Sequence, residues 1–443
     1  MSHPRCTLLN FAATALAVLL VSVFGLACNP SMWRSAQQEV ASDPCAIVLL
    51  APAGDSADRQ LLRAQQDVRE AKDLSSKLER LGWLYVSLAR TKHDPGYYEL
   101  AEQTAACIEK SHPDSAAALL LRGHVQQNLH RFQEAEQIAR RLAGQRESPF
   151  DYGLLGDALM EQGRLEEAAT AYQKMVDLRP GLESYSRAAH LRWLFGDLEG
   201  ATALMQLATR SGGARTTEPT AWAYTRLAHY ELQSGAFDRA LQAAEAALDL
   251  QPEYAPALLA QGRVLLAKGE PARAIEPLSE AARRNPLPEY QWLLADVLRA
   301  SGQHNEATRI ETEIERQGAV SDPRTFSLYL ATRERDAETA VRLAERELSN
   351  RADVFSYDAL AWSLYGAGET ERASQAMKSA LRAGTQDARL FLHAAVISAA
   401  AGETGEAARF RKKARSLRHL LLPSELDWLN SPHLSSAQKA SSS

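Results

Sequence analysis

The sequence predicts an all-α protein built from about ten helix–turn–helix repeats. The first observation is an alanine that recurs ten times, with successive spacings of 34, 33, 33, 39, 34, 33, 33, 33 and 34 residues. The second is a small residue twelve places before most of these alanines, and the third is a glycine five places before most of them. The recurring alanines are Ala101, Ala135, Ala168, Ala201, Ala240, Ala274, Ala307, Ala340, Ala373 and Ala407. A fixed period of this length is typical of a stacked repeat array.

The small residues predict where the two helices of each repeat meet. Two helices cross closely only where both carry small side chains, so each alanine is expected to face the small residue twelve places earlier. The glycines between them, such as Gly163 and Gly269, are expected to form the turns. Prolines at 180, 252 and 286 are expected to end their copies, because proline cannot continue a helix.

This pattern resembles the tetratricopeptide repeat, and residues 149–182 carry it most clearly. Tyr152, Gly156, Gly163, Ala168 and Pro180 stand where the family has such residues. The resemblance covers residues 75–421, with weaker copies near 75 and 321. It implies a right-handed α-solenoid whose first helices line a concave groove, and a function in binding rather than catalysis.

The segment before the array resembles an export signal. Residues 7–27 carry no charge, and their apolar centre at 11–24 has the length of a signal-peptide core, whereas a spanning helix needs about 20 apolar residues. Residues 1–28 end at Gly25, Leu26, Ala27 and Cys28. This ending is an imperfect match to the lipobox of bacterial lipoproteins, and the resemblance implies that Cys28 is lipidated. A plain cleaved signal and an uncleaved anchor are the alternatives. Each places the repeats outside the cytoplasm, in the cell envelope.

Residues 29–74 are predicted to be a tether followed by a capping helix. The tether contains three prolines, and the apolar island at 45–50 is expected to pack on the first helices. Residues 57–73 suggest an amphipathic helix with Leu61, Leu62 and Val68 facing inward. Of the four cysteines in the chain, only Cys45 and Cys107 lie in the body. They are expected to be two unpaired thiols because their spacing fixes no geometry, and a disulfide, which an oxidising compartment would permit, is the alternative.

Two further segments depart from the even repeat. The step of 39 residues adds a loop at 211–218, and residues 91–97 look inserted. After the last repeat, residues 422–443 are predicted to form a cap and a tail: residues 420–429 cover the last repeat, and residues 431–443 are disordered.

Counting places in the repeat predicts a candidate binding surface. In the family, the second, fifth, ninth and twelfth places line the groove, and here they hold aromatic and arginine side chains, the types that supply most energy at interfaces. The candidates are His190, Trp193, Trp222, His229, Arg263, Trp292, Arg299, Tyr329, Trp362 and Tyr365, with Trp83 preceding them. The alternative is that these aromatic rings pack between neighbouring repeats.

Several other classes of function are disfavoured. A net charge of -5 argues against nucleic acid as a partner, and the histidines of successive ninth places lie too far apart for one metal ion. A basic run from Arg409 to Arg418 is expected to be a solvated face, although an anionic surface is the alternative. No esterase, zinc-protease or phosphate-loop motif occurs, so neither an enzyme nor a cofactor is predicted.

The sequence therefore predicts an exported scaffold, anchored to a membrane, that binds a protein partner. A second hypothesis is a sensor or carrier that binds a small molecule or glycan in the aromatic groove. A third is a cytoplasmic co-chaperone whose N-terminus is merely apolar.

Overall fold

The computed structural model describes residues 43–49, 59–92, 94–213, 216–431 and 434. The predicted targeting segment with Cys28, the tether up to residue 42 and the end of the tail lie outside these residues. Within the described ranges the chain forms helices and no strands, which confirms the predicted all-α class. None of the helices described is long and apolar enough to cross a membrane.

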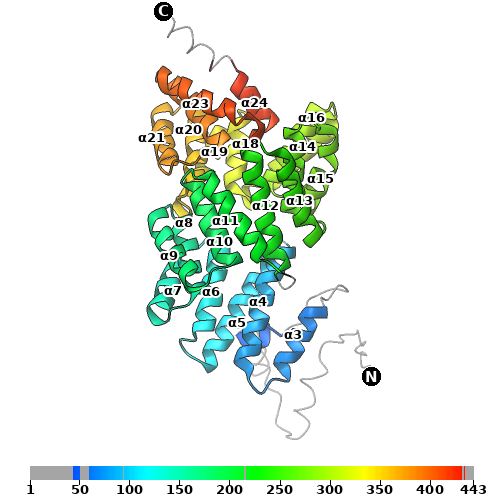
Figure 1. Ribbon diagram of the computed structural model, residues 1–443, viewed down its shortest axis with the longest axis vertical. Helices are drawn as coiled ribbons and strands as arrows, with labels where there is room; N and C mark the ends of the chain where they lie inside the picture. Colours follow the sequence, from blue (N-terminus) through cyan, green and yellow to red (C-terminus); the bar gives the residue numbers. More distant parts are fainter. Residues whose placement is uncertain (1–42, 50–58, 93, 214–215, 432–433, 435–443) are drawn as a thin grey trace, which may run out of the picture.

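Ten consecutive helix pairs form the array, and the two helices of each pair pack against each other (Figure 1). The first five pairs are α4 (Leu74–Lys92) with α5 (Gly96–Ser111), α6 (Ala116–Asn128) with α7 (Phe132–Gln145), α8 (Pro149–Glu161) with α9 (Leu165–Leu178), α10 (Leu182–Leu194) with α11 (Leu198–Ser211), and α12 (Thr217–Gln233) with α13 (Phe237–Leu250). The other five are α14 (Ala255–Ala267) with α15 (Pro271–Arg284), α16 (Pro288–Ala300) with α17 (His304–Ser321), α18 (Pro323–Thr332) with α19 (Ala337–Asn350), α20 (Val354–Gly366) with α21 (Thr370–Leu381), and α22 (Ala388–Ala400) with α23 (Thr404–Ser416).

The recurring alanines are the points of closest packing, as predicted. Nine of the ten are 0% exposed and Ala407 is 2% exposed. A side chain added at Gly156 would lie 2.3 Å from the ring of Tyr172 on the paired helix, and one at Gly262 would lie 2.4 Å from Leu278. Larger residues at these places would push the two helices apart.

The turns within the repeats also follow the sequence. The predicted turn glycines adopt left-handed backbone conformations, with φ between 72° at Gly163 and 81° at Gly196 and Gly368. Glycine adopts these angles without steric cost. The first helix of the repeat can therefore end there, and the chain can turn into the second helix. The second repeat has His130 at this place, also left-handed with φ 58°.

The array curls far enough for distant repeats to touch. Arg351 forms an ion pair with Glu161 at 2.6 Å, and the Thr385 hydroxyl donates to the carbonyl of Leu194. The side-chain amide of Gln233 donates to the carbonyl of Gln386 at 2.6 Å. In Figure 1 the C-terminal pairs, yellow to orange, accordingly lie beside the green and cyan ones. The array therefore curls until its later repeats contact the third, fourth and fifth repeats.

An ion pair beside the two irregular segments crosses the array. Some of the additional residues after α11 form the start of α12, which begins at Thr217 and has Glu218 in its first turn. Arg90, near the end of the long helix α4, lies 3.5 Å from Glu218. This contact joins the first repeat to the fifth.

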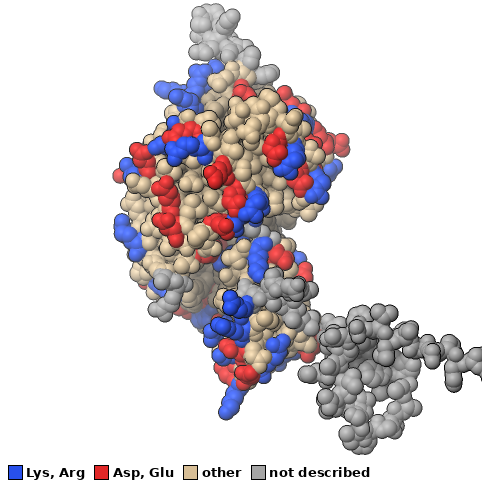
Figure 2. Space-filling model, turned by 90° about the vertical axis from the view of Figure 1, so that its right-hand side faces the viewer, with Lys and Arg blue, Asp and Glu red and all other residues tan. Residues whose placement is uncertain are grey.

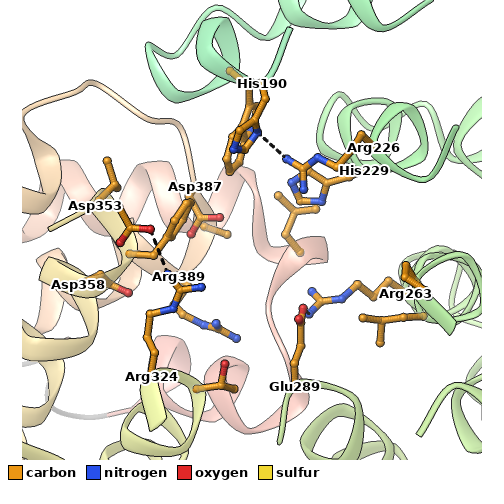
Figure 3. A pocket seen from close by; sticks show the side chains of 18 of the residues that line it. His190, Arg226, His229, Arg263, Glu289, Arg324, Asp353, Asp358, Asp387 and Arg389 are labelled. Carbon is orange, nitrogen blue, oxygen red and sulfur yellow. Dashed lines mark hydrogen bonds and ion pairs between the residues drawn. The ribbon is translucent and has the colours of Figure 1, made fainter. Parts of the chain in front are cut away.

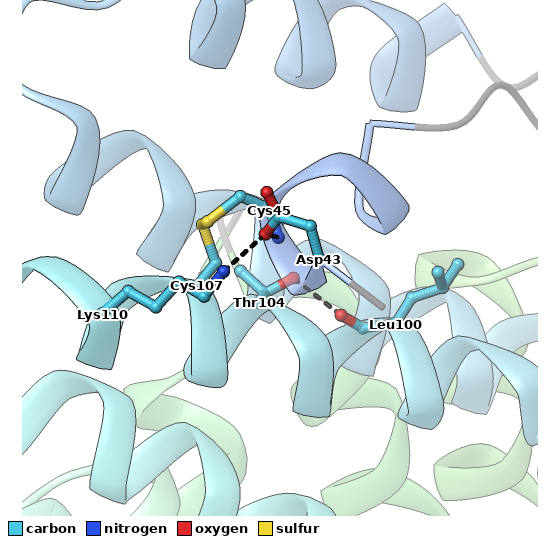
Figure 4. The surroundings of a disulfide bond; sticks show 6 residues. All are labelled: Asp43, Cys45, Leu100, Thr104, Cys107 and Lys110. Carbon is cyan, nitrogen blue, oxygen red and sulfur yellow. Dashed lines mark hydrogen bonds and ion pairs between the residues drawn. A yellow bond between two sulfur atoms is a disulfide. The ribbon is translucent and has the colours of Figure 1, made fainter. Parts of the chain in front are cut away.

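The N-terminal residues correct one prediction. Cys45, in the short helix α2 (Pro44–Ile47), and Cys107 of α5 form a disulfide bond rather than two free thiols (Figure 4). Lys110 also pairs with Asp43, the residue before α2, at 2.8 Å. The sequence spacing could not reveal this bond, because only the packing of α2 on α5 brings the two sulfur atoms together.

The apolar island packs on the first helices, as expected. Val48 is 0% exposed, and its carbonyl accepts hydrogen bonds from the Tyr85 hydroxyl and the Gln65 amide. In the capping helix α3 (Arg59–Arg69), Leu61 and Val68 are buried, but Leu62 is 39% exposed. Gln65 takes the inward place because its amide satisfies the buried carbonyl and hydroxyl.

The chain after α23 packs on the last repeat, as predicted, and also reaches earlier repeats. The C-terminal segment, residues 418–430, forms the short helix η1 (Arg418–Leu420) and α24 (Pro423–Asn430). It does not only cover the last repeat, because η1 contacts α12 and α14, and α24 contacts α16. Beyond it Leu434 is 2% exposed and its carbonyl accepts from Arg411, so this part of the predicted disordered tail is packed.

Candidate functional site

The inner side of the array contains two adjoining cavities, which differ in the side chains that line them. The first, here called the open groove, has a volume of about 1200 Å³ and lies between α4, α6, α8, α10 and α12. Its residues used below are Trp83, Arg90, His124, Phe150, Asp157, Arg187, Glu218 and Trp222. These are first helices of successive repeats, which the sequence predicted to form the concave face.

Aromatic side chains are accessible in the open groove. Trp222 is 37% exposed and Phe150 is 42% exposed. Trp83 is half-buried and packs edge-on against His124, with the ring centres 5.0 Å apart. A ligand that covers rings of this size removes a large apolar area from water, which favours binding.

Two arginines of the open groove are paired with carboxylates. Arg187 donates two hydrogen bonds to Asp157, both 2.8 Å long, and the Tyr172 hydroxyl donates a third at 2.8 Å. Arg90 pairs with Glu218. Burial and the nearby Arg187 lower the pKa of His124 to about 4, so this imidazole is neutral at pH 7. The exposed rings of the groove therefore lie beside paired charges and a neutral imidazole.

The second cavity, the central pocket, has a volume of about 500 Å³ and lies at the axis of the array (Figure 3). It shares Met160, Glu161, His190, Trp222 and Pro256 with the open groove, so the two cavities are continuous at these residues. Residues from α10, α12 and α14 line one side of it, and residues from α18, α20 and α22 line the other.

Four of the five arginines that line the central pocket form ion pairs. These pairs are Arg263 with Glu289, Arg324 with Asp353, Arg351 with Glu161, and Arg389 with Glu425. The fifth, Arg226, forms no ion pair within the described residues. It contacts the Nδ1 atom of His190 at 3.2 Å and the rings of Trp193 and Tyr230 at 5.3 Å.

The other half of the groove is filled by the chain itself. The indole nitrogen of Trp292 donates to Ser424 of α24 at 3.2 Å, and Asp296 accepts hydrogen bonds from both the backbone amide and the hydroxyl of Ser424. Trp428 of α24 packs edge-on against Trp362 with ring centres 5.0 Å apart. In this half, the first helix of each pair (α16, α18, α20 and α22) therefore contacts the C-terminal segment, at the surface where a partner was predicted to bind.

The structure divides the predicted binding residues into two groups. His190, Trp222, His229 and Arg263 line the central pocket and keep part of their surface accessible. The aromatic candidates Trp193, Trp292, Tyr329 and Trp362 are only 4%, 1%, 0% and 1% exposed, although Trp193 and Trp292 also border the pocket, and Tyr365 is half-buried beside Trp362 and Trp428. Arg299 pairs with Glu311 of the paired helix α17 at 2.6 Å. This second group packs within the protein, which is the alternative that the sequence left open.

Counting repeat places missed several residues of the site. Phe150 stands at the second place, a groove place, but was not among the candidates, whereas Arg187 and Arg226 stand at the sixth place, outside the four counted ones. The spacing of Trp222, Arg226 and His229, by four and then three residues, was the available signal for one helix face.

No cluster of metal-binding side chains occurs among the described residues. Figure 2 shows basic and acidic side chains intermixed on one face of the molecule.

The chain matches a family model for the tetratricopeptide repeat over residues 152–183, 225–287 and 259–318. These segments fall on α8 and α9 and on the helices from α12 to α17. No curated protein matches the chain.

Solved structures of MamA are among the similar folds. A crystal structure of MamA has 19% identity and a TM-score of 0.31, over 37% of this chain and 95% of that chain. MamA from Desulfovibrio magneticus RS-1, from residue 41 to its end, has 19% identity and a TM-score of 0.32, over 39% of this chain and 96% of that chain.

Proposed function

We propose that this protein is a non-catalytic scaffold of the bacterial cell envelope that binds a partner protein in the open groove. The observation that carries the proposal is a cavity of about 1200 Å³ in which Trp222 and Phe150 remain exposed. Soluble proteins rarely leave such aromatic surface uncovered in a concave site unless it binds something. The match to a repeat family built for binding supports the same conclusion.

The envelope location is supported by two features. Disulfide bonds persist in oxidising compartments, and Cys45 and Cys107 form one. Residues 1–28 resemble an export signal that ends in a lipidated cysteine. We propose that a lipid on Cys28 holds the protein at a membrane. Substituting Cys28→Ala should release it into the soluble envelope fraction, whereas full-length protein in the cytosol would overturn the proposed location.

The binding proposal is tested by affinity capture from solubilised envelopes. The Trp222→Ala/Phe150→Ala variant should lose at least nine-tenths of a specific partner that the unchanged protein recovers. A matched control is Leu178→Ala/Leu207→Ala, which removes apolar side chains that are 41% and 39% exposed outside the two cavities. Equal recovery by the folded groove variant and the control would overturn the proposal.

A second candidate function is favoured by the central pocket. Its volume of about 500 Å³ falls in the range of small-molecule sites, and its walls carry convergent polar side chains. A sensor or carrier of a small molecule or glycan would use this pocket. Thermal stabilisation by an envelope glycan, without capture of any protein, would favour this second function.

A further inference from the structure

Arg226 stands where the open groove meets the central pocket. It lies on α12 four residues after Trp222 and three before His229, so the three side chains share one face of the helix. Trp222 lines both cavities, and Arg226 and His229 line the central pocket. A ligand that lies in the open groove and reaches past Trp222 therefore meets Arg226 next.

The guanidinium of Arg226 has no anionic partner in the described chain. The other four arginines of the pocket each pair with a carboxylate. The buried Nε atom of Arg226 has no carboxylate acceptor, and the polar groups beside the guanidinium, the Tyr230 hydroxyl and the His190 imidazole, are neutral. A half-buried charge without a counterion is costly to the folded protein, so its presence in a cavity indicates an anion that is supplied from outside.

Two neutral histidines flank this guanidinium. Arginine only donates hydrogen bonds, so Nδ1 of His190, at 3.2 Å from Arg226, must accept, and the imidazole proton must reside on Nε2. Burial and the charge of Arg226 lower the pKa of His190 to about 3. Burial and the charges of Arg226 and Arg263 likewise lower the pKa of His229. At pH 7 both rings are therefore neutral, and each carries one N–H group.

The acidic residues of the pocket are occupied elsewhere. Asp353 pairs with Arg324 at 3.0 Å, Asp358 contacts Nδ1 of His393 at 2.9 Å, and Asp387 accepts from the backbone amide of Leu390 at 3.0 Å. Figure 3 shows these three aspartates on the side of the pocket away from His229 and Arg263. Because these carboxylates already have partners, Arg226 supplies the one positive charge without a counterion among the described arginines of the pocket, so a singly charged group fits it better than a multiply charged anion such as phosphate.

We propose that Arg226, flanked by His190 and His229, binds a carboxylate group of the ligand. Arginine presents two parallel N–H groups that match the two oxygen atoms of a carboxylate. The inference rests on the proposed function, because the open groove is the path by which the ligand reaches Arg226. An acidic side chain of a bound polypeptide and a free carboxylic acid share this chemistry, and the test separates them.

The test uses the full-length protein with carbon-13-labelled histidine. The imidazole resonances of His190 and His229 are followed at pH 7 while three probes are added: acetate, the peptide acetyl-Leu-Glu-Leu-amide and its Gln counterpart, acetyl-Leu-Gln-Leu-amide. We expect saturable shifts with the Glu peptide or with acetate, and none with the Gln peptide. Saturation by the Glu peptide identifies a polypeptide side chain as the source, whereas saturation by acetate alone identifies a free acid.

Three variants determine whether the shifts report on Arg226. Arg226→Gln should weaken carboxylate binding at least tenfold, and Arg226→Lys should fall between it and the unchanged protein because lysine keeps the charge but loses the paired donors. Arg192→Gln on α10 is the matched control, since Arg192 is 57% exposed and pairs with Asp197 outside the pocket. Equal shifts by the Glu and Gln peptides, with acetate no better than chloride, would overturn the inference.

Stability separates a ligand-binding role from a structural one. An arginine kept for a ligand is costly to the free protein, so Arg226→Gln should leave the thermal midpoint unchanged or raise it. A fall of several degrees would instead assign Arg226 a structural role and would contradict the inference. If Arg226→Gln still captures the envelope partner while Trp222→Ala/Phe150→Ala does not, the proposed function stands and this inference fails.

Discussion

The two halves of the inner surface share one repeat geometry but differ in what covers it. In the open groove, from α4 to α12, Trp222 is 37% exposed. In the half from α16 to α22, Trp292 and Trp362 are 1% exposed because the C-terminal segment lies on them. The same buried alanines hold both halves together. At these tryptophans the difference therefore comes from the segment that follows the last repeat, whereas Trp193 of α10 is buried by the curl of the array, which stacks Phe355 on its ring.

The filled half also shows how this surface holds a helix. Asp296 binds the first turn of α24 through the backbone amide and hydroxyl of Ser424, and the Trp428 indole donates to the carbonyl of Thr332 at 3.0 Å. A carboxylate at a helix start and an aromatic ring further along are a general means of docking a helix.

The largest expected contrast is between two tryptophans. Trp292→Ala should destabilise the protein by about 3–5 kcal/mol, as for other fully buried aromatic residues. Trp222→Ala should cost about 1 kcal/mol or less, because its ring is already in contact with water. Urea denaturation of both variants gives the two values. Similar losses would mean that the two halves are not covered differently.

Removing the disulfide should affect one end of the array. The Cys45→Ala/Cys107→Ala variant should lose about 2–4 kcal/mol of stability. In repeat arrays each repeat contacts mainly its neighbours, so hydrogen exchange should accelerate in α4 and α5 and remain unchanged in α20 and α22. Uniform acceleration across the chain would indicate a single cooperative unit instead.

Acid should weaken the protein through histidines of the open groove and central pocket. The pKa values of His124 and His190 are lowered to about 4 and about 3, and that of His229 is also lowered. Below pH 6.5 the unfolded chain therefore binds protons that the folded chain excludes, so stability falls from pH 6.5 toward pH 4.

The loss between pH 7 and pH 5 should be about 1 kcal/mol for each histidine, since the rings are partly exposed. The urea midpoint at the two pH values measures it. Substituting His190→Asn and His229→Asn should reduce the difference between the two midpoints. A midpoint that is equal or higher at pH 5 would contradict the lowered pKa values.

The smallest expected effect concerns one hydroxyl under the C-terminal segment. Ser424→Ala removes hydrogen bonds to Asp296 and Trp292 but keeps the backbone amide that also binds Asp296. We expect a loss of about 1 kcal/mol, the net value of a typical hydrogen bond. Increased accessibility of Trp292 to a fluorescence quencher would accompany it. A loss as large as that of Trp292→Ala would mean that the segment depends on this hydroxyl alone.

Local pattern predicted the repeats and their turns well. The alanines and glycines act within one repeat, so their spacing alone fixed the register that placed His190, Trp222, His229 and Arg263 on the inner surface. The burial of Trp292 and Trp362 could not be predicted in this way. It depends on Ser424 and Trp428, which are far away in sequence and belong to no repeat. The disulfide and the pairing of Arg351 with Glu161 depend on long-range packing for the same reason.

The central claim is that only one half of the inner surface is free to bind a partner. Site-specific photo-crosslinking tests it, with a benzophenone amino acid placed in the intact protein either at Trp222 or at Tyr365. The account predicts that the probe at 222 crosslinks to a partner in envelopes. The probe at 365 should crosslink within the chain to α24, because Tyr365 packs against Trp428. A partner captured from position 365, with none from position 222, would contradict the claim.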